Sequence, residues 1–279
     1  MLYIIIPVFN RWHFTRDCLI SLMQQSNKLF KVIVVDHGST DGTDSNIASG
    51  FPWVTVLHGD NSMWWTAAVN LGIKYALNKK AAYILTLNND TVAESDYIAQ
   101  LYKAIDNAPP YALIGSASID VVTKEVTYRG EKVNWLLQSN YSNNLIEVEP
   151  ENGLVPVTHF PGRGLLISRH VFEEIGFFDE KYFPHYMADY EFTLRAAKKA
   201  FPLFCAWNAK IGTYPEASGA NELKKVKSIN AYKQHLFGIK GGANLPLFYR
   251  FALRHCPVYA LPSYLLLGTA RRLFGYWIK

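Results

Sequence analysis

Short apolar runs alternate with helix-like stretches through the first 116 residues of the chain. In the clearest case a run is followed by Ala68, Leu71 and Tyr75 at helical spacing, which indicates an amphipathic helix after a buried strand. The predicted strands are residues 2–6, 31–35, 54–57, 83–87 and 112–116, and the predicted helices are residues 12–25, 43–49, 66–78 and 95–107. This order predicts an α/β fold with a mainly parallel, right-handed, doubly wound sheet.

The pattern changes after residue 116. Alternating polarity predicts a hairpin over residues 121–135, and a polar stretch predicts a loop over residues 140–153. Helical spacing predicts helices over residues 169–175 and 188–200. From about Lys224 onward the chain is basic, aromatic and apolar, which is typical of helices on an anionic membrane surface or of an appendage packed on a domain or another subunit. We therefore expect a domain of residues 1–221, divided at residue 116, and a helical tail of residues 222–279.

Two of the predicted strands end in an acidic residue. Residues 31–35 lead into Asp36, and residues 83–87 lead into Asn88, Asn89 and Asp90. Ligands of open α/β sheets bind at the carboxyl ends of strands, and a carboxylate there suits a divalent cation that holds a phosphate. The sequence therefore predicts a nucleotide site; turn-forming Asp and Asn residues are the alternative.

Composition narrows the class of protein. A chain of 279 residues with 49% apolar and 18% charged residues is typical of a folded globular protein. The net charge of +5, without a dense basic run in the first 160 residues, argues against nucleic-acid binding. Three scattered cysteines indicate a reduced, cytosolic chain. We expect neither a signal peptide nor a run of the about 18–20 apolar residues that a membrane span needs.

Eight short motifs follow one another in a fixed order, at residues 4–10, 34–43, 61–65, 68–73, 87–90, 162–167, 176–183 and 189–195. Each motif alone is weak, but the ordered set is specific and covers about residues 2–218. Together they resemble the family-2 inverting glycosyltransferases, and most of all the rhamnosyltransferase-like branch that builds bacterial O-antigen, capsule and other surface polysaccharides. The resemblance implies the GT-A fold, a Rossmann-like mixed sheet flanked by helices, here with a C-terminal helical appendage.

The resemblance implies a donor site in residues 1–116 and an acceptor half in residues 117–221. Asp36 would accept the ring N–H of uracil or thymine. Asp90 would hold Mg²⁺ or Mn²⁺ on the diphosphate of the donor. No second acid would help it, because Asn88 stands where the motif usually has its first acid. The other positions that match donor-binding segments are Pro7, Phe9, Asn61, Trp65, Asn70, Asn89, Arg163 and Gly164. Trp64 and Trp65 could instead be core residues, since Trp is highly buried on average.

The same resemblance makes Asp189 the general base, although Ala188 stands where the first acid of that motif is usual. Glu191 would orient the site or help to position Arg195. The alternative for Asp189 is an N-cap on the helix that follows it.

The family often carries a late histidine at the metal or diphosphate, and the matching residues 211–218 contain none. His159 and His185 are interpreted as ordinary surface or loop residues. Arg163 could replace the missing cation, because a guanidinium suits a phosphate, or it could be a solvated loop arginine.

The resemblance thus implies a metal-dependent inverting enzyme that moves a sugar from a dTDP- or UDP-linked donor to a hydroxyl of a growing glycan. A lipid-linked acceptor and peripheral contact with an anionic membrane, at the inner face of the plasma membrane, would suit the basic aromatic tail. Two other classes stay open: a non-catalytic sugar-nucleotide or glycan binder, and a nucleotidyltransferase. The latter would need a Gly-rich basic loop after the first strand, which residues 7–11 do not supply.

Overall fold

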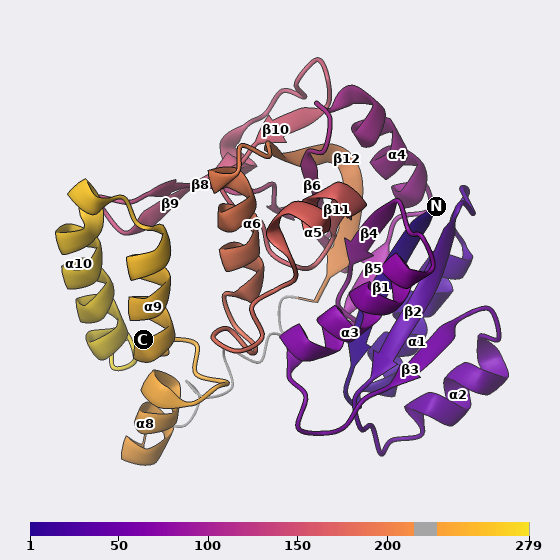
Figure 1. Ribbon diagram of the computed structural model, residues 1–279, viewed down its shortest axis with the longest axis horizontal. Coiled ribbons are helices and arrows are strands. Elements are labelled where there is room, and N and C mark those ends of the chain that lie inside the picture. The colour runs from indigo at the N-terminus through magenta and orange to yellow at the C-terminus, as the bar shows by residue number, and fades with distance from the viewer. Residues whose placement is uncertain (215–227, 279) are drawn as a thin grey trace.

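One ten-stranded mixed sheet runs through the molecule, and helices cover both of its faces (Figure 1). The computed structural model describes residues 1–214 and 228–278. Along the main path of the sheet the strands are β10 (Leu154–Pro156), β12 (Leu203–Thr213), β6 (Leu113–Asp120), β11 (Leu165–Ser168), β4 (Tyr83–Thr86), β1 (Leu2–Val8), β2 (Phe30–Asp36) and β3 (Thr55–His58). Off this path, β5 (Thr91–Ala93) pairs with β12, and β7 (Val126–Tyr128) pairs with β6. The predicted α/β class with a mixed sheet is confirmed.

The helices of the sheet domain agree with the predicted ones to within about three residues at their ends. They are α1 (Trp12–Met23), α2 (Thr43–Gly50), α3 (Trp65–Asn78), α4 (Tyr97–Asn107), α5 (Arg169–Ile175) and α6 (Ala188–Lys198).

Strand direction decides where the candidate acids meet. β1 pairs in parallel with both β2 and β4, so these three strands end at the same edge of the sheet. β11 lies between β4 and β6 and is antiparallel to both. The residues that precede β11 in the chain therefore arrive at the edge where β4 ends.

The second half of the sheet differs from the prediction in three places. Residues 121–135 do not form one hairpin; instead β8 (Glu131–Asn134) pairs with β9 (Ser139–Ser142), so the predicted loop at 140–153 begins in a strand. β10 and the long strand β12 were not predicted. Most of β12 is buried by β6, β5 and β10 around it, although its sequence includes Asn208 and Lys210.

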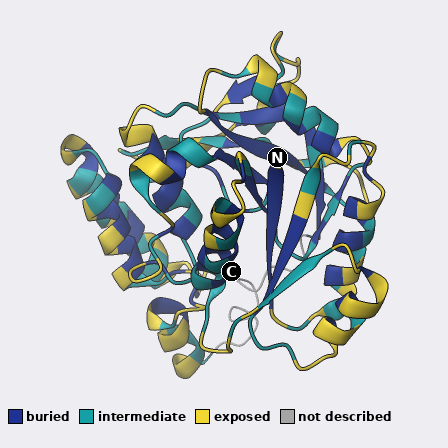
Figure 2. Cartoon of the chain, turned by 45° about the vertical axis from the view of Figure 1, so that its right-hand side comes forward, coloured by how far each residue is buried: buried dark blue, intermediate teal, exposed yellow. Residues whose placement is uncertain are grey.

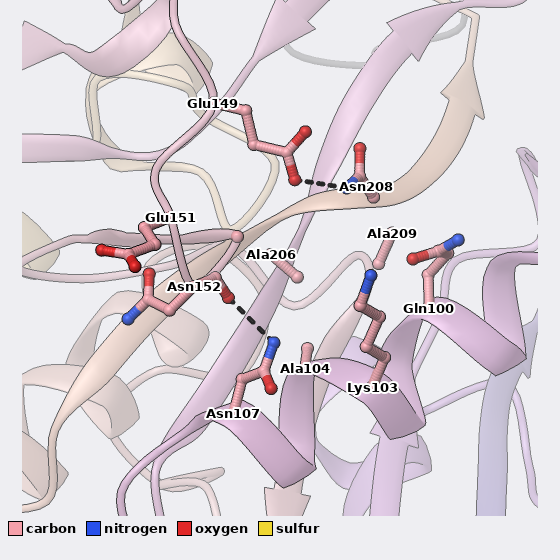
Figure 3. A pocket seen from close by; sticks show the side chains of 11 residues that line it. Gln100, Lys103, Ala104, Asn107, Glu149, Glu151, Asn152, Ala206, Asn208 and Ala209 are labelled. Atoms are coloured by element: carbon pink, nitrogen blue, oxygen red, sulfur yellow. Dashed lines mark hydrogen bonds between the residues drawn. The ribbon is translucent and has the colours of Figure 1, made fainter.

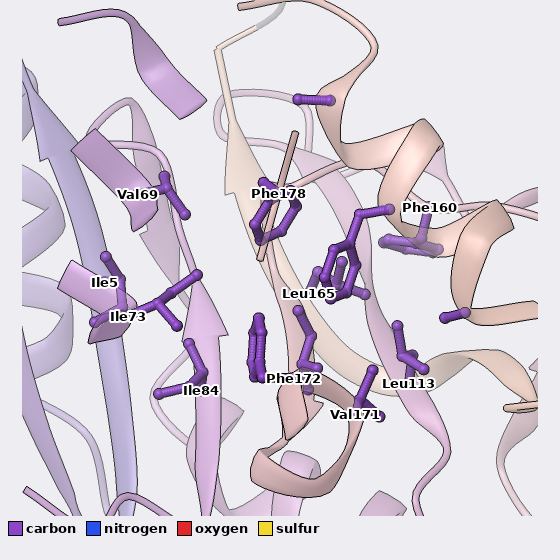
Figure 4. Packing of buried hydrophobic residues seen from close by; sticks show 14 of the residues in the cluster. Ile5, Val69, Ile73, Ile84, Leu113, Phe160, Leu165, Val171, Phe172 and Phe178 are labelled. Atoms are coloured by element: carbon purple, nitrogen blue, oxygen red, sulfur yellow. The ribbon is translucent and has the colours of Figure 1, made fainter. Parts of the chain in front are cut away.

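Two apolar clusters fill the two faces of the sheet. On one face α3, α5 and α6 pack against the strands through side chains such as Val69 and Phe172, and Phe178 of the loop after α5 joins the same cluster (Figure 4). Figure 2 shows the central strands buried while the helices expose their outer sides. The close approach of α3 to β1 depends on Gly72, because a Cβ there would lie 2.4 Å from Cγ2 of Ile5.

The predicted helical appendage is present and packs on the sheet domain. It consists of α8 (Ile229–Phe237), α9 (Leu245–His255) and α10 (Leu261–Phe274). Leu247 and Phe251 of α9 belong to the same apolar cluster as α6, and Phe248 packs with Tyr264 of α10. The predicted boundary at residue 221 lies outside the described residues. Within residues 1–214 and 228–278, no helix has the length and apolarity that a membrane crossing requires.

Candidate active site

Hydrogen bonds fix the two asparagines that follow β4. Asn88 Oδ1 accepts from Nε1 of Trp65 at 3.0 Å. Asn89 Nδ2 donates to Oγ1 of Thr15 at 3.0 Å. Both amides are therefore engaged by other side chains, whereas the partner of the Asp90 carboxylate is a cation.

The Asp90 carboxylate is half-buried and faces a cation. Nη1 of Arg11 lies 3.6 Å from Asp90 Oδ2. Burial raises the pKa of Asp90, and the charges of Arg11 and Arg163 oppose that rise. An anionic group brought to this place would meet two arginines beside a single carboxylate.

Asp189 lies in the first turn of α6. The N-cap of this helix is Met187, with φ of 65°, so Asp189 is not the capping residue. Asp189 Oδ2 accepts from the N–H of Gly162 at 2.8 Å, and Oδ1 accepts from the N–H of Tyr190 at 2.9 Å. Burial raises the pKa of Asp189, and these two hydrogen bonds oppose the rise.

Trp65 and Gly162 connect the Asp90 end to the Asp189 end. A Cβ on Gly162 would lie 2.5 Å from Cη2 of Trp65 and 3.6 Å from Cβ of Asp189. Because the other end of the same indole donates to Asn88, one ring spans the distance between the two acidic segments. The structure thus brings together acids that stand about 100 residues apart in the chain.

Asp36 ends β2 and is buried. Its Oδ1 accepts from the N–H of Gly38 at 3.2 Å and from the N–H of Ser39 at 2.8 Å. Next to it, the exposed ring of Phe9 stacks on His37 with 5.3 Å between ring centroids. This end of the site offers a carboxylate beside an aromatic surface.

Pro7 and Asn61 border the same end. Pro7 pairs in register with Val35, the residue before Asp36. Asn61 lies over Gly38, whose Cβ would come within 3.1 Å of it, and Gly38 has a φ of 107°, which favours glycine.

Arg163 and Gly164 precede β11 at the same edge of the sheet. The Arg163 guanidinium carbon lies 5.9 Å from the ring centroid of Tyr128. Its Nε is buried and has no hydrogen-bond partner among the residues that the structure describes. Gly164 has a φ of 81°, and a Cβ there would lie 2.8 Å from Ser116, so its contribution is backbone geometry.

Asn70 takes a different place from the one expected for a wall of the donor site. It is buried, and its Nδ2 donates to the carbonyl of Phe178 and to Oε2 of Glu180, both at 2.9 Å. Its Oδ1 accepts from the N–H of Phe178 at 3.2 Å. We therefore assign Asn70 to holding the loop before α6 against α3, and not to donor contact.

Glu191 is fully buried at the centre of an ion-pair network. Its carboxylate accepts from Nε of Arg195 at 3.1 Å and from Nη1 of Arg254, in the tail, at 3.0 Å. Arg254 also donates to Asp179 Oδ2 at 2.6 Å. Burial by itself would raise the pKa of Glu191, but the nearby His255, whose Nε2 lies 3.7 Å from Oε1, and hydrogen bonds from Arg195 and Arg254 outweigh it and lower the pKa to about 2.

The two histidines interpreted as surface or loop residues behave differently. His159 is buried, with its ring nitrogens 3.0 Å from Glu131 Oε1 and 3.0 Å from Thr158 Oγ1, so the surface interpretation is wrong for it. Its ring also packs edge-on against Tyr190, next to Asp189. His185 is half-buried in the loop before α6. Of the stretch matching the late histidine, residues 215–218 lie outside the described residues.

A small polar pocket lies elsewhere (Figure 3). It has a volume of about 50 Å³ and is formed by α4, residues 149–153 and β12. Lys103 and Asn107 of α4 line it with Glu149 and Asn208. It contains none of the candidate site residues.

The described residues contain no group of three or more His, Cys, Asp or Glu side chains that could hold a metal ion. Asp90 thus belongs to no such group, and an ion held there would have it as its carboxylate. Mg²⁺ is commonly bound by one or two carboxylates with the remaining oxygens from substrate phosphates and water. The residues present fit an ion that is shared with a bound diphosphate.

Comparison with known sequences gives a consistent family. The sequence profile of Glycosyl transferase family 2 matches residues 3–176. Glycosyltransferase GlyG of Streptococcus pneumoniae is 27% identical over 120 residues, which are 42% of this chain and 38% of GlyG. The uncharacterized glycosyltransferase RP339 of Rickettsia prowazekii is 30% identical over 193 residues, which are 67% of this chain and 56% of that protein. The chain thus spans about half or less of the length of these curated relatives.

Two solved structures share the fold. Residues 1–349 of S. aureus TarS superpose with a TM-score of 0.55 at 16% identity, covering 98% of this chain and 80% of that one. GalNAc-T7, solved with UDP, GalNAc and Mn²⁺, superposes with a TM-score of 0.62 at 14% identity, covering 77% of this chain and 43% of that one.

Proposed function

Because this chain belongs to glycosyl transferase family 2, we propose that it transfers a sugar from a dTDP- or UDP-linked donor to a hydroxyl of a growing glycan, with inversion at the anomeric carbon. The observation that carries this proposal is the meeting of the two acidic segments, Asp90 and Asp189, on Trp65 and Gly162. Inverting transfer needs a base at the acceptor hydroxyl and a positive charge at the departing diphosphate, and these two segments supply one site for each.

Asp189 is the proposed general base. It takes the proton of the acceptor hydroxyl as that oxygen attacks the anomeric carbon from the face opposite the diphosphate. A carboxylate whose pKa is raised by burial accepts a proton more readily, and general-base help is typically worth about 10²–10⁴ in rate. The hydrogen bond from Gly162 holds one carboxylate oxygen in place, which leaves the carboxylate oriented by the backbone before substrate arrives.

Asp90 is the proposed protein ligand of Mg²⁺ or Mn²⁺. When bound, the ion supplies charge stabilisation to the leaving diphosphate. The presence of UDP and Mn²⁺ in the GalNAc-T7 structure supports a divalent cation here. Arg163 adds a guanidinium whose Nε has no partner among the described residues and suits a phosphate oxygen.

The remaining donor contacts are proposed from their positions around Asp36. The Asp36 carboxylate would accept the ring N–H of the base, with the face of Phe9 available for stacking. Pro7 and Asn61 border this end, and Asn89 and Gly164 shape the backbone near the diphosphate. The rhamnosyltransferase-like branch and the donor sugar stay predictions.

We also propose that the acceptor is lipid-linked and that the enzyme works at the cytoplasmic face of the plasma membrane. All 23 acidic residues precede residue 223, whereas ten of the 28 basic residues follow it. Large apolar side chains of the tail are exposed, among them Leu253, Val258, Tyr259 and Leu266. Basic residues near an anionic surface contribute about 1 kcal/mol each, so vesicles of anionic lipid should bind the full chain and release it at high salt.

A non-catalytic binder of sugar nucleotides is the second candidate, since Asn88 and Ala188 stand where acids are usual. The discriminating experiment compares the parent with Asp189→Asn, a variant that keeps the side-chain shape and removes the base. The enzyme hypothesis expects donor-stabilised folding in both proteins and transfer or slow donor hydrolysis in the parent alone. Equal turnover in both would reject Asp189 as the base, and no turnover in the parent with any stabilising donor would favour the binder.

A further inference from the structure

Three side chains from separate segments meet beside Trp65. Trp64 is the N-cap of α3, His185 lies in the loop before α6, and Lys240 lies between α8 and α9. The rings of Trp64 and His185 are 5.6 Å apart between centroids. Nζ of Lys240 lies 5.9 Å from the centroid of Trp64. The tail thus brings a cation to Trp64, the residue next to Trp65 in the chain.

One polar group of this cluster is exposed, and another has no hydrogen-bond partner among the described residues. Lys240 is exposed and makes no ion pair with any residue in 1–214 or 228–278. Nδ1 of His185 is buried without a hydrogen-bond partner in the described part of the chain. Burial, and then the charges of Lys240 and His37, lower the pKa of His185 to about 4, so at neutral pH its ring is uncharged and can donate or accept one hydrogen bond.

The cluster is separate from the group proposed for the donor diphosphate. That group consists of Asp90 with Arg11 and Arg163, whereas the ionisable neighbours of His185 are Lys240 and His37, and His37 stacks on Phe9 at the Asp36 end of the site. His185 also stands four residues before Asp189, the proposed base, which must face the acceptor hydroxyl. An aromatic ring with an adjacent cation suits a sugar whose apolar face stacks and whose substituent is negative.

We propose that Trp64, His185 and Lys240 form an acceptor subsite for a sugar that carries an anionic group, either a phosphate or a carboxylate. Trp64 packs on the ring of this sugar, Lys240 binds the anionic group, and His185 bonds a hydroxyl. This inference rests on the proposed function, because it names the class of acceptor for that same site.

The test uses the full chain and three probes of similar size: glucose 1-phosphate, glucuronic acid and glucose. Binding is measured by saturation-transfer NMR with Mg²⁺ present, first without UDP and then after UDP is added. We expect at least one charged probe to bind and glucose to bind more weakly. Lys240→Gln should weaken the charged probe about tenfold, as loss of one charge-assisted hydrogen bond does, and Lys240→Arg should restore it. Lys233→Gln, an exposed lysine of the same tail, is the control and should change nothing.

Each outcome either supports or rejects the proposed acceptor subsite. A response to glucose 1-phosphate alone identifies phosphate, and a response to glucuronic acid alone identifies carboxylate. Equal binding of glucose, no binding of any probe, or no effect of Lys240→Gln rejects the subsite. Displacement of the charged probe by UDP assigns the cluster to the donor and overturns the acceptor role. Thermal stabilisation by UDP and by dTDP is recorded in parallel. Stabilisation by either nucleotide together with failure of the probes rejects only this inference, whereas the absence of stabilisation by both rejects the donor site itself.

Discussion

Replacing Glu191 by glutamine tests whether the tail and α6 are held together by a buried charge. The side chain is fully buried and is paired with Arg195 and Arg254. Its pKa falls from the ordinary value of 4.5 to about 2. Because one pKa unit corresponds to 1.36 kcal/mol, this charge contributes about 3 kcal/mol to the free energy of unfolding at pH 7. Glu191→Gln should therefore lower that free energy by about 3 kcal/mol.

The pH dependence gives the prediction its sign. The folded-state pKa lies below the unfolded one, so the contribution is complete above pH 4.5 and is lost as the pH falls toward 2. The difference between parent and variant, measured by urea denaturation, should be constant from neutral pH down to about 5 and should shrink below that.

The matched control is Glu173→Gln. Glu173 pairs with Arg169 at 3.3 Å across one turn of α5, but its side chain is 54% exposed. Exposed pairs of this kind contribute about 0.3–0.5 kcal/mol. If Glu191→Gln costs no more than Glu173→Gln, or if its cost does not change on acidification, the network does not hold the tail and the reasoning fails.

Three further predictions concern the site and the core. Asp90→Ala should weaken donor binding and remove its response to Mn²⁺, since Asn88 and Asn89 are engaged elsewhere; calorimetry that finds the parent's metal response would place the ligand elsewhere. In a plot of transfer rate against pH, the rate should fall on the acid side at a pH above the usual carboxyl range, because burial raises the pKa of Asp189 and the base is lost as the pH falls through it. A fall at an ordinary aspartate pKa contradicts this. Gly72→Ala should lower the free energy of unfolding in urea by about 1–3 kcal/mol, because the new Cβ meets Ile5. Gly50→Ala, with open space around it, should not lower it, and equal effects of the two changes would contradict the packing argument.

The strands of the first half could be predicted because they are buried on both faces. Parallel strands of this kind appear as continuous apolar runs, and β1, β2 and β4 have that pattern. β12 could not be predicted in the same way. Polar residues such as Asn208 and Lys210 interrupt its run, and its burial comes from pairing with strands far away in the sequence.

The candidate acids were found from ordered motifs, but the side chains that support them were not. Arg254 reaches Glu191 across 63 positions of the chain, and Lys240 reaches Trp64 from the tail. Every charged residue after Glu222 is basic, so sequence alone does not distinguish a lysine or arginine of the tail that faces solvent from one that faces the domain. Asn70 shows the opposite case, because a polar residue in a donor-type motif proves to be a buried structural contact.

The antiparallel insertion of β11 has a consequence for the order in which parts of the protein can fold. β1, β2, β3 and β4 and their helices lie within the first 107 residues and can assemble from neighbouring segments. β11 must then enter the sheet beside β4, where Oγ1 of Thr86 donates a hydrogen bond to the carbonyl of Leu165, 79 positions away. Only then can the N–H of Gly162 donate to the carboxylate of Asp189. Loop closure of that length is slow compared with local pairing. A chain emerging from the ribosome would thus form the edge that carries Asp36 and Asp90 first and the contact between Gly162 and Asp189 last.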